Sequence, residues 1–278
     1  MKSKNNIEIQ IVELIERLPP LPSNIDYLMS YSNENSAKQE RLIEMVSEDP
    51  GLCTDLLRIA NEYGISDYHI ETIEEAVKEV GILPLIQLVG LWYSKDIISM
   101  EFAFLDNLDQ YFIHSREISL SCRILAEVSG IKQHGSQVLA VAGLIHDIGR
   151  LVIMLAAKKD TAPLMGTQWN EMKSVLRDEK DVFGMDHCIV GEQICKKWNF
   201  SAFMQEGILR HHTPLIGNDF SYLGGIIFLA HFLAYSDFSG EMLDKILPLE
   251  LCAKLGFDLD NFKKARIEYK LCRSKMKF

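Results

Sequence analysis

Histidine is the residue type in this chain whose spacing points most directly to chemistry. Seven of the eight histidines lie beyond residue 113, and five of these accompany one aspartate in short motifs. Neutral imidazole and carboxylate groups together bind borderline divalent metals such as zinc, manganese, iron and nickel. The sequence therefore predicts a shared pocket for such an ion, built from His114, the adjacent pair His146-Asp147, His187 and the pair His211-His212.

The elements that must position these residues are helix ends. The segment A-G-L-I-H-D-I-G-R places His146 and Asp147 where an apolar helix meets a glycine, so both side chains can turn toward one point. His187 is predicted in the first turn of a later helix, and His211-His212 at the carboxyl end of the next. Helical proteins build metal centres from ligands on several packed helices. In such a centre the aspartate can bridge two ions, and paired ions can activate water and hold a phosphoryl group.

Each histidine also has a simpler interpretation. A lone histidine on a helix is often exposed or satisfied by one polar partner. His146 and the pair His211-His212 stand at helix carboxyl ends, where the helix dipole favours a protonated imidazole. The concentration of histidines at corresponding helix ends favours the shared pocket over these separate explanations. His69 and His134 lie in turn-like contexts and are predicted to be surface residues.

Helical periodicity accounts for most of the chain. Glycine and proline are sparse, with 17 and 8 residues, and they fall between stretches whose apolar residues recur at three- and four-residue spacings. Alternating runs of β-branched residues are largely missing, so the predicted fold class is all-α. Helices are predicted over residues 7–18, 23–31, 36–47, 49–64, 72–81, 84–98, 109–128, 137–146, 151–156, 168–177, 185–198, 202–212 and 222–236. Thr72 and Glu75 are predicted to form a capping box at the start of the helix over 72–81.

Two lobes and a carboxyl-terminal extension are predicted from the order of these helices. With 278 residues and 47% hydrophobic composition, the chain is long enough for a substantial core. An acidic, aromatic stretch at residues 100–109 separates an amino-terminal helical lobe, residues 1–105, from the lobe that carries the histidines, residues 106–240. Residues 241–278 are predicted to add one or two amphipathic helices.

Charge and cysteine content restrict the partners and the compartment. A net charge of −10 is spread along the chain, so no basic face for nucleic acid is expected. The amino terminus lacks the apolar stretch of a secretory signal, and the clean apolar runs are too short to span a bilayer. These features predict a cytoplasmic protein with no membrane association. The six cysteines show no C-x-x-C spacing and are interpreted as small core hydrophobes in a reducing compartment.

Longer motifs occur in a fixed order along the chain. The first half contains L-P-P-L-P at 18–22, V-S-E-D-P-G-L-C-T-D-L-L-R-I-A-N at 46–61 and I-E-E-A-V-K-E-V-G at 73–81. The second half contains A-G-L-I-H-D-I-G-R-L at 142–151, F-G-M-D-H-C-I-V-G at 183–191 and I-L-R-H-H-T-P at 208–214. In this ordered set, residues 12–212 resemble the HDOD domain, a bacterial signalling relative of the HD metal-dependent phosphohydrolases. The resemblance implies an amino-terminal helical lobe packed on an HD-type helical lobe.

The resemblance also implies a set of metal ligands. In catalytic HD enzymes these are a first histidine, the His-Asp pair, further histidines and a late aspartate on a helix. The late aspartate is expected in residues 226–236, where this chain has His231, whose imidazole is also predicted as a metal ligand. The chain also lacks a Gly-Tyr-Pro motif after its histidine pair, and Arg150 stands where hydrolytic relatives often have lysine. The other ligand positions are matched by His114, His146, Asp147, His187, His211 and His212.

These departures favour a bacterial regulatory or signal-transduction module without catalysis, whose pocket holds a manganese, iron, nickel or zinc ion. Its partner would be a signalling protein or a small-molecule ligand, and the sequence specifies neither this partner nor the oligomeric state. The alternative is a metal-dependent phosphohydrolase acting on a nucleotide or phosphate ester. In that alternative Asp147 bridges the metals and orients the attacking water, and Arg150 binds phosphate. A purely structural scaffold is disfavoured if the imidazoles face one another, because clustered buried polar groups are costly.

Overall fold

The computed structural model describes residues 4–18, 43, 57, 61, 70–80, 108–131, 133–157, 174–198, 200–234 and 247–274. These residues are helical apart from turns and one short hairpin, which confirms the predicted all-α class. The helices predicted at 23–31, 36–47, 49–64 and 84–98 lie outside the described residues, apart from single positions. The described helices are α1 (Lys4–Arg17), α5 (Ile73–Val80), α7 (Leu108–Val128), α8 (Gln133–Ile145), α9 (Ile148–Ala157), α11 (Val175–Phe183), α12 (His187–Lys197), α13 (Ala202–Arg210), α14 (Tyr222–Ala234), α16 (Leu249–Leu255) and α17 (Leu259–Arg273).

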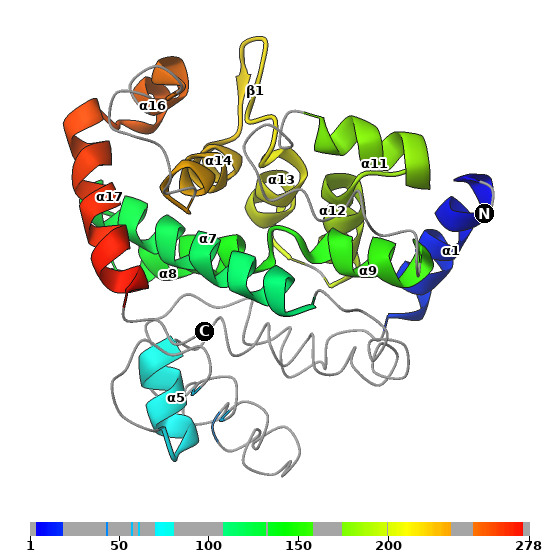
Figure 1. Ribbon diagram of the computed structural model, residues 1–278, viewed down its shortest axis with the longest axis horizontal. Helices are drawn as coiled ribbons and strands as arrows, with labels where there is room; N and C mark the ends of the chain where they lie inside the picture. Colours follow the sequence, from blue (N-terminus) through cyan, green and yellow to red (C-terminus); the bar gives the residue numbers. More distant parts are fainter. Residues whose placement is uncertain are drawn as a thin grey trace.

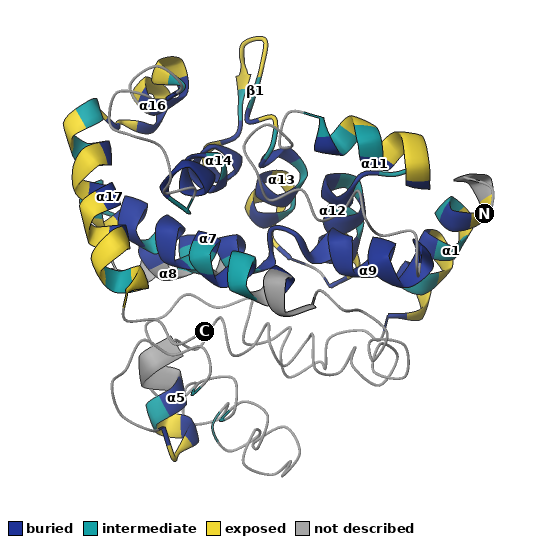
Figure 2. Cartoon of the chain, viewed as in Figure 1, coloured by how far each residue is buried: buried dark blue, intermediate teal, exposed yellow. Residues whose placement is uncertain are grey.

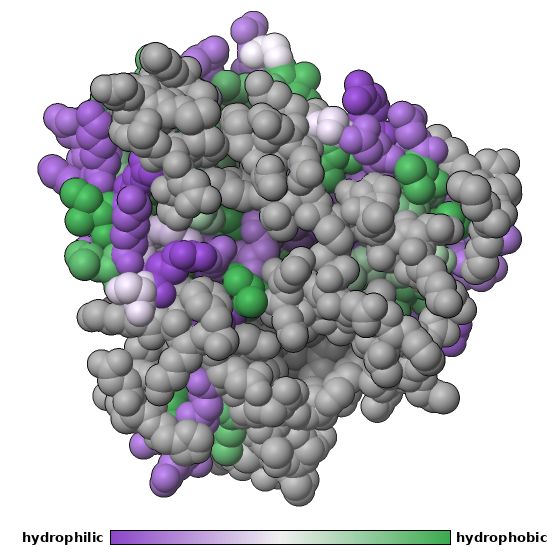
Figure 3. All heavy atoms as spheres, viewed as in Figure 1, coloured by the Kyte–Doolittle hydropathy of each residue, from purple (hydrophilic) through white to green (hydrophobic). Residues whose placement is uncertain are grey.

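The core lies where α7, α8 and α9 meet α12, α13 and α14. Helix α7 packs against α8 and α14, α12 packs against α9 and α13, and α13 packs against α14. Figure 1 shows α7, α8 and α9 across the middle of the view, with the other three above them. Every residue of α9 is buried, and α14 is nearly as enclosed, whereas α11, α16 and α17 carry exposed faces (Figure 2). Hydrophilic side chains gather at the left edge and upper right of the face in Figure 3, where α17 and α11 lie.

The amino-terminal helix follows its predicted amphipathic pattern. Helix α1 begins at Lys4, earlier than the predicted residue 7, and its apolar positions Ile7, Ile11, Ile15 and Leu18 are buried. This spacing places them on one helix face, and α1 packs with it on α9 and α11. A helix assigned from sequence to the amino-terminal lobe thus packs on helices of the second lobe, and it also contacts α12, which begins at His187.

Local hydrogen bonds fix two helix starts. The predicted capping box is confirmed at α5, where the backbone N–H of Glu75 donates to Thr72 Oγ1 at 3.1 Å and that of Thr72 donates to Glu75 Oε2 at 3.2 Å. At α12 the side chain of Asp186 accepts from the backbone N–H of Ile189 at 2.9 Å. This second cap sets His187 as the first residue of its helix.

Two features of this part of the fold differ from the sequence prediction. Where a helix was predicted over 168–177, helix α11 begins at Val175, after Ser174, and runs to Phe183, and Gly184, with φ of 92°, ends it. The charged run before that glycine looks like a loop but lies on the helix. The hairpin of β1 (Leu215–Ile216) and β2 (Asp219–Phe220) was not predicted, since two-residue strands carry no alternation.

The carboxyl-terminal prediction of one or two helices is confirmed by α16 and α17, and α17 packs on α7. The stretch Val138–Ala157 is long and apolar enough to cross a membrane by length and composition, but 82% of its apolar window is buried inside the protein. It comprises most of α8 and all of α9, so its composition is that of core helices. The division into residues 1–105, 106–240 and 241–278 stays a prediction.

Candidate metal centre

The predicted histidines come together where six helices meet. His114 lies within α7, His146 and Asp147 form the turn between α8 and α9, and His187 begins α12. His211 follows the last residue of α13, His212 comes next, and His231 lies in the last turn of α14. Centres of neighbouring imidazole rings are 4.4 to 6.3 Å apart.

A glycine allows the close approach that brings two of these helices together. A Cβ atom at Gly149, in α9, would lie 2.0 Å from the backbone oxygen of His187 and 2.7 Å from the backbone nitrogen of Gly191. No side chain fits at such distances from another backbone. The absence of a side chain at Gly149 therefore lets α9 pack on α12 and sets Asp147 beside His187.

Four histidines are anchored through Nδ1. A carbonyl or carboxylate oxygen can only accept, so in each case Nδ1 carries a proton and donates, and in the neutral form of each ring Nε2 holds the lone pair. Three of these bonds go to the backbone oxygen three or four residues earlier, joining His146 to Gly143 (2.7 Å), His211 to Ile208 (2.7 Å) and His231 to Ile227 (2.8 Å).

The fourth anchor is a carboxylate. His187 Nδ1 donates to Glu179 Oε2 at 2.6 Å, and the same oxygen accepts the backbone N–H of His187 at 2.8 Å. Glu179, on α11, is fully buried. A carboxylate behind an imidazole fixes its orientation and increases the basicity of the opposite nitrogen, as is common for metal-binding histidines.

Asp147 occupies the middle of the cluster and is 1% exposed. Both of its oxygens face nitrogen atoms from other helices. Oδ1 lies 3.1 Å from His187 Nε2 and 3.5 Å from His211 Nε2, and Oδ2 lies 3.6 Å from His114 Nε2, 3.3 Å from His146 Nε2 and 3.2 Å from Arg150 Nε.

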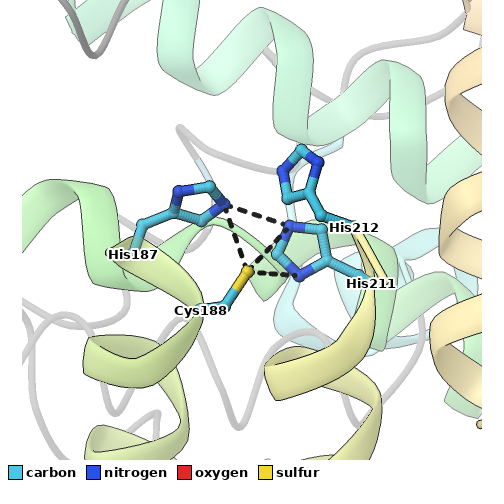
Figure 4. A group of neighbouring side chains, drawn as sticks. All are labelled: His187, Cys188, His211 and His212. Carbon is cyan, nitrogen blue, oxygen red and sulfur yellow. Dashed lines mark hydrogen bonds between the residues drawn. The ribbon is translucent and has the colours of Figure 1, made fainter. Parts of the chain in front are cut away.

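The candidate ligand atoms divide into two neighbouring groups. The first, which we call the cysteine group, consists of His187, Cys188, His211 and His212 (Figure 4). One candidate ligand atom from each of these residues lies within 4.8 Å of those from the other three. The histidine group is equally compact and consists of His114, His146 and His231. A third such set, His146, Asp147 and His211, joins the two groups.

Burial and charge separate the histidines by their proton affinity. Burial lowers the pKa of His114 to about 3, assisted by His146. Burial also lowers the pKa of His146, and it holds the pKa values of His212 and His231 well below the ordinary range. The histidine group is therefore neutral at pH 7.

In the cysteine group, neighbouring anionic side chains raise the pKa of two histidines. Burial opposes a charge on His187, but Glu179 and Cys188 outweigh it and hold the pKa of His187 well above its usual value. Burial also opposes a charge on His211, but Cys188 and Asp147 raise the pKa of His211 to about 9.

The two acidic side chains beside these histidines, Asp147 and Cys188, both have a lowered pKa. Burial raises the pKa of Asp147, but Arg150, His146 and His187 together hold it well below its usual range. Burial raises the pKa of the Cys188 thiol, but His211 and His187 lower it overall.

The donor set fits a divalent cation. His146 Nε2 and both ring nitrogens of His212 are buried and have no hydrogen-bond partner. A buried polar atom without a partner costs about 1–3 kcal/mol. His146 Nε2 also faces the Asp147 carboxylate as a lone pair, so two acceptors oppose each other. A cation between such atoms would satisfy both.

The structure brings together all the residues predicted as metal ligands, including His231. Their roles as ligands, and those of Asp147 and Arg150 in catalysis, stay predictions. Sequence reasoning missed Glu179 and Cys188. The position of Cys188 directly after His187 was the available signal, whereas Glu179 stood inside a charged run with no distinguishing feature. His69 lies outside the described residues, as does the side chain of His134.

This combination of helices and motifs is shared with known proteins. The sequence profile of the HDOD domain matches residues 18–214, which is most of the chain. No curated protein matches the sequence.

Solved structures share the fold over nearly the whole chain. An HDOD domain protein of unknown function from Geobacter sulfurreducens superimposes with a TM-score of 0.68 at 18% identity, covering 97% of this chain and 96% of its own. For a candidate phosphohydrolase from Shewanella amazonensis SB2B the TM-score is 0.65 at 20% identity, with coverage of 97% and 99%. For a candidate signal-transduction protein from Marinobacter aquaeolei VT8 it is 0.64 at 14% identity, with coverage of 99% and 65%. At these identities the likeness establishes the fold alone.

Proposed function

The chain belongs to the HDOD domain family, and from that premise we propose that it is a regulatory signalling module that does not hydrolyse phosphoesters. In this proposal the histidine centre holds a divalent metal ion that joins α12 and α13 to the turn between α8 and α9. A signalling protein or a small-molecule ligand binds at the surface of the module, and the regulatory signal is transmitted through that contact. The ion then serves to hold the regulatory conformation together.

The enclosure of Asp147 is the observation that carries this proposal. A catalytic carboxylate of this type needs a free lone pair directed at water or substrate. Asp147 is 1% exposed, and its oxygens face Arg150 and four histidines, which come from α7, the end of α8, the start of α12 and the end of α13. Structural metal sites are closed in this way, whereas catalytic sites keep an open position.

Charge supports the same conclusion. The histidine group offers three neutral imidazoles and no carboxylate of its own. With His231 at the position where catalytic relatives have an aspartate, a second dication there would be poorly compensated. Bound in the cysteine group, an ion would supply the positive charge that Asp147 and the inward lone pairs require.

A metal-dependent phosphohydrolase is the second candidate. The observation in its favour is the set His146, Asp147 and His211, which links two ligand groups as a bridging carboxylate does in two-metal sites. In that case His114, His146 and His231 would hold one ion and the cysteine group the other, while Arg150 would bind phosphate. Arg150 is 8% exposed and its Nε is directed at Asp147, which favours a role in charge balance.

The two functions are separated by measuring metal content and turnover on the same preparations. Purified protein is analysed for transition metals, then assayed on nucleotides and generic phosphodiesters with added manganese or nickel. We expect about one ion per chain and no turnover above the protein-free control. Asp147→Asn is compared with Asp178→Asn, on the exposed face of α11, and only Asp147→Asn should lose metal and thermal stability. Robust turnover that disappears in Asp147→Asn alone would establish the hydrolase instead.

A further inference from the structure

Among the cysteines that the structure describes, Cys188 is set apart by its surroundings. Cys122, Cys195 and Cys252 are buried in the hydrophobic core, as the sequence predicted for all six. Cys188 is equally buried, at 2% exposure, but its Sγ lies 3.6 Å from His187 Nε2 and faces the ring of His211, at 3.7 Å from Nδ1 and 3.9 Å from Nε2. Figure 4 shows the sulfur directed at both imidazoles, with His212 beside them.

The spacing of these atoms matches that of ligands around one tetrahedral ion. Typical zinc–nitrogen and zinc–sulfur bonds place two nitrogen ligands about 3.3 Å apart, and a nitrogen and a sulfur about 3.6 Å apart. The two Nε2 atoms of His187 and His211 are 3.2 Å apart. The two Sγ–Nε2 distances in this group are 3.6 and 3.9 Å. These three distances agree with the tetrahedral values within a few tenths of an ångström.

The fourth position is available in the same group. Both ring nitrogens of His212 are buried and have no hydrogen-bond partner, and one of them lies within 4.8 Å of the other three ligand atoms. Its neighbour His211 already directs Nδ1 at a backbone carbonyl and Nε2 at the centre. His212 therefore has an unused lone pair beside three converging ligands.

The position of Cys188 favours a thiolate. It is the second residue of α12, where the free N–H groups and the dipole of the helix stabilise negative charge. A thiolate is softer than a carboxylate and favours zinc, iron(II) or cobalt(II) over manganese and magnesium. It also adds the anionic charge that the histidine group lacks.

We propose that His187, Cys188, His211 and His212 form a tetrahedral His3Cys site that binds a zinc-class ion through the Cys188 thiolate. The inference rests on the proposed function, because it specifies the ligands and the metal class of that centre. It assigns the ion to the cysteine group and leaves the histidine group as a separate, weaker site. Asp147 then lies beside the ion and compensates its charge.

Cobalt(II) is the probe that tests the sulfur ligand directly. Tetrahedral cobalt has intense visible bands, and a bound thiolate adds a near-ultraviolet sulfur-to-cobalt charge-transfer band. The full-length protein, with metal removed by chelation, is titrated with cobalt and then with competing zinc. We expect one equivalent to produce both spectral features and zinc to abolish them.

Three variants identify the sulfur. Cys188→Ala and Cys188→Ser remove the ligand, the serine retaining most of its volume, and Cys195→Ala is the control because Cys195 is buried on the same helix. Both substitutions of Cys188 should abolish the charge-transfer band and weaken zinc binding by about a hundredfold. The control should retain both. Circular dichroism establishes that each variant is folded.

The remaining outcomes separate the inference from the proposed function. If the unsubstituted protein binds cobalt without a charge-transfer band, or the Cys188 variants keep the band, the cysteine site is wrong while a metal centre stands. If the unsubstituted protein binds neither cobalt nor zinc, the metal centre of the proposed function is wrong and the cysteine site falls with it.

Discussion

The cysteine group and the histidine group lie side by side, yet they are built differently. Behind His187 stands the carboxylate of Glu179, and the cysteine group adds the sulfur of Cys188. In the histidine group, Nδ1 of His146 and of His231 donates to a neutral backbone carbonyl. The pKa of His187 is raised well above its usual value, whereas the pKa of His231 is lowered well below it.

This difference shows that imidazoles alone do not determine the affinity of a site for a cation. Burial disfavours positive charge in both groups, and nearby anions offset that effect only at His187 and His211, two members of the cysteine group. A cation should therefore occupy the cysteine group first, and the histidine group should respond weakly. The following predictions test this contrast, beginning with the largest expected effect.

Adding a side chain at the close contact between α9 and α12 should disrupt the cysteine group most. In Gly149→Ala the new methyl group would meet the backbone of His187, so we expect the free energy of unfolding to fall by about 3 kcal/mol. Urea denaturation measures this. Gly225→Ala is the control, since its Cβ would meet the flexible ends of Leu251 and Leu255 at 3.1 and 3.2 Å, and its effect should stay below about 1 kcal/mol. Equal stabilities for the two variants would contradict the close approach.

Removing one histidine from each group should have unequal consequences. His187→Ala deletes a ligand of the cysteine group and leaves Glu179 without its imidazole partner. We expect its zinc affinity to fall by at least about a hundredfold, against less than about threefold for His231→Ala. Competition with a chromophoric chelator measures both values. Similar losses in the two variants would show that the groups share one ion equally.

Removing the ion should lower stability as expected for a ligand of the native state. At a free zinc concentration about a hundred times the Kd, binding adds about 2.7 kcal/mol to the free energy of unfolding. Excess chelator should remove that contribution from the unsubstituted protein, and should have a much smaller effect on Cys188→Ala. Denaturant unfolding with and without chelator is the measurement. An unchanged midpoint would argue that the native state binds no ion.

Neutralising the carboxylate behind His187 should have the smallest of these effects. Glu179→Gln retains the shape of the side chain and an acceptor for His187 Nδ1 but removes the charge, so zinc affinity should fall about tenfold. Glu192→Gln, which removes a surface partner of Lys196 on α12, should leave the affinity unchanged. If both substitutions are silent, the orientation of His187 depends on its backbone and not on Glu179.

The sequence predicted the elements whose signals are local. The helix expected over 109–128 is α7, Leu108–Val128, because its apolar periodicity is long and its boundaries are distinct. The capping box at Thr72 and Glu75 was identified for the same reason, as it depends on residues three apart. The end of α11 and the short hairpin were missed, since one depends on the conformation of Gly184 and the other has strands of two residues.

The sequence by itself determined the family and the helical class and predicted the candidate ligand types, because motifs and periodicity are properties of neighbouring residues. It also identified His231 as the departure from the catalytic pattern. Only the tertiary structure decided that the histidines form two groups, that Glu179 supports one of them and that Cys188 belongs to it. These features depend on distances between α9, α11, α12 and α13, and those distances follow from how the helices pack, as at Gly149.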